Sequence, residues 1–237
     1  MIPDELRAEY DQRVLDVKQR IAKAEQLRRA LGRAGLWLAP AKILDVGCGS
    51  ALILDALDAP NALKFGCDIR VGPFLHSNVD RAQVIFVQGD ARRLPFRECV
   101  FDLVVCLAVI EELAEWRESL EAMARCVAPG GVLYVTMTNG KTLTRWYSFA
   151  NNVGIRVHAG WWFYAKSSLR LLGLPARGFG LDVFQGWRYV NVTPHLARAT
   201  LPISCAVPVP LLAWLLKWIA PSFAYAWQRP PADGTSK

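Results

Sequence analysis

The sequence lacks closely spaced cysteine pairs. Its six cysteines form no C-x-x-C pair, although such spacing is typical of structural zinc sites. Cys48, Cys67, Cys106 and Cys205 lie in or beside apolar stretches, as small buried hydrophobic residues do in a reducing compartment. We therefore expect free, mostly buried thiols and no metal site.

The chain also lacks a signal peptide and an uninterrupted membrane span. Residues 1–5 have neither the basic start nor the apolar run of a secretory signal, which predicts a cytoplasmic protein. Residues 201–220 are almost wholly apolar, but prolines interrupt them and only 211–220 remain as an unbroken helical stretch. Such a helix is about 15 Å long, against about 30 Å of hydrocarbon. We expect a core helix or an interfacial attachment there.

Acidic residues are nearly absent from the last part of the chain. Residues 139–237 hold 11 Lys and Arg but only two acids, Asp182 and Asp233, whereas residues 1–138 carry a net charge of −2. The same segment contains seven of the nine tryptophans. A basic, Trp-rich segment predicts contact with an anionic, partly apolar partner: a membrane surface or lipid-linked acceptor, or RNA.

Strand-like and helical segments alternate through the middle of the chain. Strands are predicted over 43–46, 64–69, 84–88, 101–106, 132–138, 184–192 and 222–228, and helices over 3–31, from 52, over 72–79 and over 111–126. This order predicts an α/β, Rossmann-like, seven-stranded and mostly parallel sheet with helices on both faces. Right-handed crossovers bring the C-terminal ends of the parallel strands to one edge, where ligands bind.

A glycine turn follows the first predicted strand. The apolar run at 43–46 leads into Gly47 and Gly49, and a helical pattern starts just after. Glycine permits close backbone approach and a positive φ. A dinucleotide fingerprint needs a third glycine at position 52, where this chain has Leu52. Asp45, just before the turn, would repel a phosphate, so a cationic or neutral ligand is favoured over a nicotinamide dinucleotide.

These residues, with four later motifs, resemble the class I S-adenosylmethionine-dependent methyltransferases. The resemblance covers roughly residues 40–195. Besides the glycine turn, it rests on Asp68 at the end of the second strand and on Gly89-Asp90-Ala91 after the third. The segment 101–105 matches the family's fourth strand, and 125–131 resembles its "R-x-L-x-P-G-G" turn.

The resemblance implies how S-adenosyl-L-methionine is held. Asp68 would accept hydrogen bonds from the ribose hydroxyls, Asp90 from the adenine amino group, and Asp45 would organise the glycine turn and the ammonium end. Carboxylates suit these roles because they accept charge-assisted hydrogen bonds. The candidate cofactor-binding residues are Asp45, Gly47, Cys48, Gly49, Asp68, Ile69, Asp90, Ala91 and Leu107.

The proton acceptor is less clearly marked. After the fourth strand many members resemble "V-L-E-H-L", whereas this chain has Glu112 in place of that His. Glu112 is therefore one catalytic candidate, or else a solvated helix acid. His158 is the other, because the segment from 158 to 169 resembles a family segment whose His nears the substrate. No Asn-Pro-Pro-Tyr follows the fourth strand, which disfavours the amino-methylating type.

The sequence thus predicts a methyltransferase that acts on a small or lipid-linked acceptor, most often at oxygen, in the cytoplasm or peripherally at the membrane. One domain is expected: an N-terminal lid helix (1–38) with Tyr10 and Arg13 as candidate contacts, a cofactor-binding core (40–138), an acceptor-covering insert (139–180) and last strands with an apolar helix (181–237). An RNA methyltransferase and a non-catalytic cofactor-binding interaction protein remain alternatives.

Overall fold

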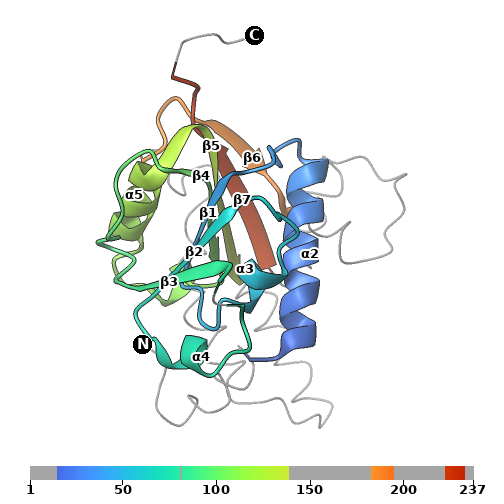
Figure 1. Cartoon of the computed structure of the whole chain (residues 1–237). Coiled ribbons are helices and arrows are strands. Elements are labelled where there is room, and N and C mark those ends of the chain that lie inside the picture. The colour runs from blue at the N-terminus through green and yellow to red at the C-terminus, as the bar shows by residue number, and fades with distance from the viewer. Residues whose placement is uncertain (1–14, 81, 139–182, 195–221, 233–237) are drawn as a thin grey trace, which may run out of the picture.

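The sheet at the centre of the computed structural model has seven strands in the order β3-β2-β1-β4-β5-β7-β6 (Figure 1). The structure describes residues 15–80, 82–138, 183–194 and 222–232. The strands are β1 Lys42–Val46, β2 Leu63–Asp68, β3 Val84–Gln88, β4 Phe101–Leu107, β5 Val127–Thr138, β6 Arg188–Asn191 and β7 Ser222–Gln228. The expected seven-stranded α/β sheet is confirmed.

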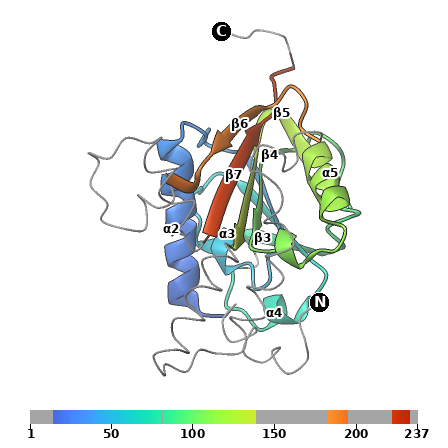
Figure 2. The ribbon, with the colours of Figure 1, turned by 180° about the vertical axis from the view of Figure 1, so that it is seen from behind.

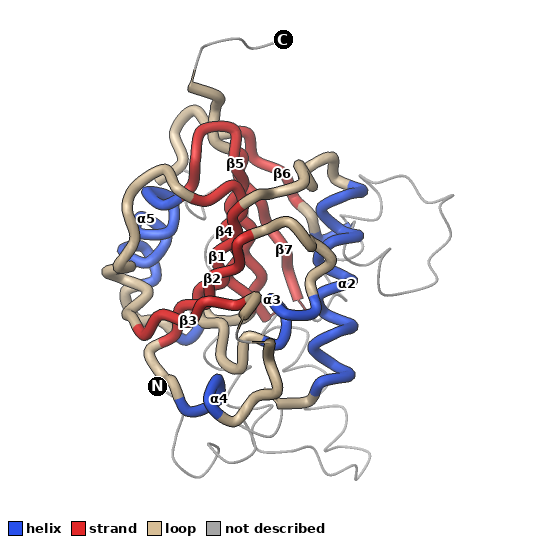
Figure 3. Tube along the Cα trace, in the orientation of Figure 1, coloured by secondary structure: helices blue, strands red, loops and turns tan. Residues whose placement is uncertain are grey.

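Strands β1 to β5 run parallel, and β7 inserts antiparallel between β5 and β6. The strand order reverses at β1, which pairs with β2 on one side and β4 on the other. Figure 3 shows the five parallel strands ending at the same edge, near helix α4. Ligands of open α/β sheets bind at such an edge, beside the reversal point.

Helices cover both faces of the sheet, as Figures 1 and 2 show from opposite sides. Helix α2 (Val17–Arg33) and the short α3 (Leu52–Ala56) pack on one face, and α5 (Trp116–Cys126) on the other. Alternate residues of each strand enter the two cores: Ile43 packs on the α2 side and Leu44 on the α5 side. This alternation follows from the two-residue period of a strand.

The helix predicted over 3–31 is interrupted at Asp16, and its first part, up to residue 14, lies outside the described residues. Asp16 has an extended ψ of 95°, and its side chain caps α2 by accepting a hydrogen bond from the amide of Gln19 at 3.1 Å. A cap ends the helical hydrogen-bond ladder, so the continuous apolar pattern concealed this boundary. The helix also continues past Gly32 to Arg33.

The helix predicted over 111–126 is divided. A 3-10 turn, η1 (Ile110–Glu112), ends at Leu113, whose ψ of 128° is extended, and α5 begins only at Trp116. The helix ends at Cys126 as predicted. Strand β5 starts directly at Val127, earlier than the predicted residue 132, and carries Gly130, at φ 77°, within it. The register between β4 and β5 shifts there, between Phe101 and Leu103, so the glycines form an irregularity inside a strand.

Two further elements are shorter than predicted. Helix α4 (Gly72–Leu75) ends at His76, whose Nδ1 lies 2.8 Å from the carbonyl of Gly72. Strand β6 covers Arg188–Asn191 only, because residues 184–187 turn so that Phe184 stacks on Trp227 with ring centroids 4.6 Å apart. The expected apolar helix at 211–220 and the insert at 139–180 lie outside the described residues. No helix in the described part of the chain is long and apolar enough to cross a membrane.

Gly66 in β2 leaves the space that the glycine turn needs. A Cβ at position 66 would lie 2.7 Å from Sγ of Cys48, and Cys48 is buried. We therefore expect Gly66→Ala to lower the free energy of unfolding by about 1–3 kcal/mol through overpacking. Chemical denaturation should show the loss, and a Cys48→Ala background should reduce it. Gly72→Ala is the control, since a Cβ there meets nothing within 4 Å; an equal loss in both variants would contradict the steric explanation.

Candidate functional site

The candidate site lies at the edge where the parallel strands end. Asp45 stands one residue before the end of β1, Asp68 ends β2, and Leu107 ends β4. The glycine turn follows β1, and Asp90 follows β3 after Gly89. The parallel topology therefore brings together residues that lie up to 62 positions apart in the sequence.

Backbone hydrogen bonds hold the glycine turn against the end of β2. The carbonyl of Cys67 accepts from the amides of Gly47 at 2.7 Å and Cys48 at 3.3 Å, and Oδ2 of Asp68 accepts from the amide of Gly49 at 2.8 Å. A phosphate-binding turn directs its amides at the ligand. Here three successive amides are already engaged, so the turn lacks the donors that a pyrophosphate needs.

The segment after β4 packs directly on this turn. Gly47 has φ 78°, and a Cβ at that position would lie 2.3 Å from Cγ2 of Val109. Val109 is held there by its neighbour Ala108, which has a left-handed φ of 57° and donates its amide to the carbonyl and Oγ1 of Thr136, both at 3.1 Å. Glycine at position 47 is thus required both by its conformation and by the contact.

Asp45 is a buried carboxylate beneath the turn. Its exposed fraction is 2%, and Oδ1 has no hydrogen-bond partner among the described residues. Burial, and secondarily the negative charge of Asp68, raise the pKa of Asp45 to about 7. The positive charge of Arg20 on α2 lowers this pKa and so offsets part of the rise. A carboxylate in this state attracts a cation. Sequence reasoning missed Arg20, because the uninterrupted pattern over 3–31 did not show where α2 begins.

Asp68 is half-buried and links the turn to the chain after β2. Besides the Gly49 amide, it accepts from the amide of Arg70 through Oδ1 at 2.9 Å. A carboxylate has about four lone-pair positions, so each oxygen can accept a further hydrogen bond. Ile69, which follows it, is among the exposed large apolar residues and offers a flat apolar contact at the same edge.

Asp90 forms an ion pair with Arg92. Oδ1 and Oδ2 each accept from Nε at 3.0 Å, and Oδ2 also accepts from Nη2 at 2.6 Å. These hydrogen bonds lower the pKa of Asp90, so the carboxylate is ionised. Arg92 also reaches Glu115 at 3.4 Å, which connects this loop to the segment before α5. Sequence reasoning placed Asp90 at the site but not its arginine partner.

The other predicted cofactor residues support the turn. Cys48 is buried, and burial together with Asp45 raises the pKa of its thiol, so it is a neutral packing group. Leu107 and Ala91 are half-buried and pack against the cores on the two faces of the sheet. Among the described residues, no group of His, Cys, Asp and Glu is arranged to hold a metal ion.

Comparison with known proteins identifies this arrangement. Residues 44–135 match the family described as "Methyltransferase domain", and this segment runs from β1 through most of β5. This part of the chain is similar to the methyltransferase domains of that family. The expected resemblance is confirmed.

Two similar proteins are named for quinone biosynthesis. "Demethylmenaquinone methyltransferase" of Mycolicibacterium gilvum (strain PYR-GCK) is 39% identical over 118 residues, which cover 48% of this chain and 50% of that protein. "Ubiquinone biosynthesis O-methyltransferase" of Saccharophagus degradans is 28% identical over 107 residues, 43% of this chain and 45% of that protein. The chain thus spans about half the length of the curated relatives it matches.

The fold is shared more widely. The plantazolicin methyltransferase BpumL, solved in complex with SAH, aligns with a TM-score of 0.64 over 95% of this chain and 89% of its own. The two sequences are only 15% identical. This likeness establishes the methyltransferase fold and carries no information about the acceptor.

The catalytic candidates of the methyltransferase domain are only partly described. Glu112 lies in η1 and is half-buried, whereas its neighbour Glu111 is 2% exposed. Glu111 is therefore buried in the core, and Glu112 is the more exposed of the two acids. His158 and the lid contacts Tyr10 and Arg13 lie outside the described residues.

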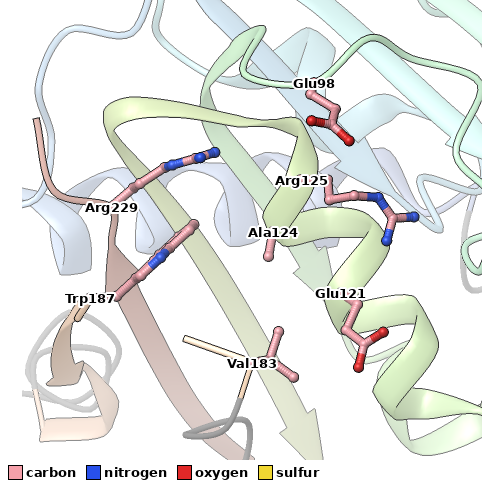
Figure 4. Close-up of a pocket in the computed structure, with 7 residues that line it drawn as sticks. All are labelled: Glu98, Glu121, Ala124, Arg125, Val183, Trp187 and Arg229. Carbon is pink, nitrogen blue, oxygen red and sulfur yellow. The ribbon is translucent and has the colours of Figure 1, made fainter. Parts of the chain in front are cut away.

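A cleft of about 430 Å³ lies at the opposite edge of the methyltransferase domain (Figure 4). Arg229 covers the ring of Trp187 at 5.7 Å and donates to the carbonyl of Val127 at 2.7 Å. Arg125 and Glu121 reach the same cleft from α5. It opens beside the start of β5 and the end of β7, away from Asp45 and Asp68, so it is separate from the cofactor edge.

Proposed function

We propose that the protein transfers a methyl group from S-adenosyl-L-methionine to a small or lipid-linked acceptor, at an oxygen atom. The observation that carries the proposal is the buried Asp45, with an unpartnered Oδ1 among the described residues, beneath a turn whose amides are already engaged. Such a site favours a cationic ligand over a phosphate. S-adenosyl-L-methionine is a cation with a carboxylate, a ribose and an adenine.

The residues at the edge fit each part of that cofactor. Asp45 would accept a hydrogen bond from the ammonium group of the cofactor. Arg20, whose charge acts on Asp45, would pair with the carboxylate of the cofactor. Asp68 would hold the ribose hydroxyls with its remaining lone pairs, and Asp90 the adenine amino group. The bound cofactor supplies a methyl group on a sulfonium leaving group, so the protein mainly positions the acceptor.

The acceptor class is inferred from similarity and composition. The relatives named above are demethylmenaquinone and ubiquinone-biosynthesis methyltransferases, and the second of them is named an O-methyltransferase, which favours an oxygen acceptor. The basic, Trp-rich segment 139–237 suits an apolar acceptor carried on a lipid tail. An oxygen acceptor must lose its proton during transfer. We assign that role to Glu112, with His158 as the second candidate.

Two measurements test this proposal. Calorimetric titration should give micromolar binding of S-adenosyl-L-methionine and of its demethylated product, with no binding of a nicotinamide dinucleotide. Incubation with methyl-labelled cofactor should then label a short-chain phenolic quinone precursor or a lipid fraction, with the label on oxygen. Labelling of RNA alone would instead establish the RNA alternative. Cofactor binding without transfer to any lipid, RNA or small-molecule fraction would favour a non-catalytic interaction protein.

Glu112→Gln tests the proton acceptor. If Glu112 removes the acceptor's proton, the variant should lose about 10²–10⁴-fold in kcat, while its affinity for S-adenosyl-L-methionine stays within about twofold. Glu118→Gln on the exposed side of α5 is the matched control and should keep wild-type kcat. An unchanged kcat in Glu112→Gln would transfer the role to another group.

A further inference from the structure

Helix α2 is strongly basic, whereas the body that it covers is acidic. Its 17 residues contain six Lys and Arg and one acid, Glu25, which gives a net charge of +5. The other 121 residues before position 139 contain 11 Lys and Arg and 18 acids, a net charge of −7. In this half of the chain α2 therefore carries a net positive charge, whereas the other residues together carry a net negative charge.

Several of the six basic residues interact with the protein itself. The charge of Arg20 acts on the buried Asp45, Nε of Arg28 lies 3.5 Å from Oδ2 of Asp58, and Arg29 forms an ion pair with Glu25, one turn before it on α2. Lys18, Lys23, Arg29 and Arg33 are exposed. At 100° per residue, Lys18, Arg29 and Arg33 lie within a 60° arc opposite the buried Leu27. The helix thus presents a basic row away from the core.

Exposed apolar side chains accompany this row. Val17 and Ile21, one turn apart on α2, are 45% and 51% exposed. Ile69, directly after β2, is 64% exposed, and Leu75, the last residue of α4, is 53% exposed. Because α2 runs antiparallel to β1, its first turns lie at the cofactor edge, on the same side of the molecule as α4 (Figures 1 and 2). Lys18, in the first turn of α2, therefore joins these apolar groups at this edge, whereas Arg29 and Arg33 continue the basic row toward the other end of the helix.

We infer that α2 is a docking helix for an anionic lipid surface. Lys18, Arg29 and Arg33 would face the headgroups, while Val17 and Ile21 enter the interfacial region. This contact would hold the cofactor edge against the bilayer, where a lipid-linked acceptor is found; the inference rests on the proposed function in that respect. Lipid is favoured over nucleic acid because α2 contains no Phe, Tyr, Trp or His on which bases could stack.

Vesicle flotation with the full chain tests the inference. Wild type should bind vesicles of phosphatidylcholine with 30% phosphatidylglycerol, and bind pure phosphatidylcholine far more weakly. Each basic residue near an anionic surface contributes about fivefold to binding, so Lys18→Glu with Arg33→Glu should reduce the partition coefficient by at least about 25-fold. Arg97→Glu with Arg125→Glu makes the same charge change at exposed positions elsewhere and should retain most of the binding.

An apolar pair separates lipid insertion from simple charge attraction. The double variant Val17→Ser with Ile21→Ser should reduce vesicle binding several-fold. The control double variant is Leu38→Ser with Leu63→Ser, which should not reduce it. Leu38 and Leu63 are 52% and 53% exposed, and they lie beyond the C-terminal end of α2 and at the start of β2. Equal binding by the α2 and control variants, or no vesicle binding by wild type, would overturn the inference. So would charge-dependent binding to single-stranded RNA without vesicle binding. Calorimetry with S-adenosyl-L-methionine reports separately on the proposed function and on folding of each variant.

Discussion

Asp45→Asn is expected to stabilise the ligand-free protein at pH 8 and to weaken cofactor binding. The raised pKa of Asp45, about 7 against an ordinary value of 3.8, means that the folded state holds a proton that the unfolded state releases. Ionising this buried group therefore costs the fold up to about 4 kcal/mol once the pH exceeds 7. Asparagine removes that cost.

The sign of the pH dependence makes this prediction specific. Between about pH 4 and pH 7 the folded wild type binds more protons than the unfolded chain, so its free energy of unfolding falls as pH rises through this window. The gain from Asp45→Asn should be near zero at pH 4 and largest above pH 7. Urea denaturation at several pH values measures it, with Asp58→Asn, an exposed acid, as control. A gain independent of pH would exclude the buried charge as its cause.

The same substitution should reduce affinity for S-adenosyl-L-methionine by at least about tenfold, because a buried carboxylate that pairs with an ammonium contributes more than about 1.4 kcal/mol. In wild type the affinity should increase from pH 5 to pH 7 as Asp45 ionises. Calorimetry across this range measures both effects. If Asp45→Asn stabilised the protein above pH 7 without weakening the binding of S-adenosyl-L-methionine, Asp45 would act only in folding.

Asp68→Ala is expected to reduce cofactor affinity by at least about 100-fold. Two charge-assisted hydrogen bonds to the ribose are worth about 3 kcal/mol together, and the variant also frees the Gly49 amide that Oδ2 holds at 2.8 Å. Because the charge of Asp68 contributes to the raised pKa of Asp45, its loss should lower that pKa and move the fall in stability to a lower pH.

Calorimetry and thermal unfolding of Asp68→Ala separate these effects. Asp58→Ala is the matched control, since Asp58 is exposed and forms a 3.5 Å ion pair with Arg28. The control should bind cofactor as wild type does. Retained affinity in a folded Asp68→Ala protein would mean that the ribose lies elsewhere on the edge.

The sequence by itself determined the sheet and the place of the site. Apolar runs bounded by glycine and acids located β1, β3, β4 and β7 to within one residue, because strands buried on both faces are nearly continuous in hydrophobicity. Gly47, Gly49, Asp45 and Asp68 could be assigned to one edge for the same reason: parallel topology fixes where every strand ends. The match to the methyltransferase family confirmed the fold and the cofactor.

Only the tertiary structure decided the electrostatics and the boundaries within the site. The interaction of Arg20 with Asp45 joins residues 25 positions apart and depends on how α2 lies along β1. The raised pKa of Asp45 depends on its complete burial, which no local pattern specifies. The separation of η1 from α5, and the start of β5 before its glycines, follow from strand pairing and loop packing. Those are contacts between distant segments, and local propensity does not encode them.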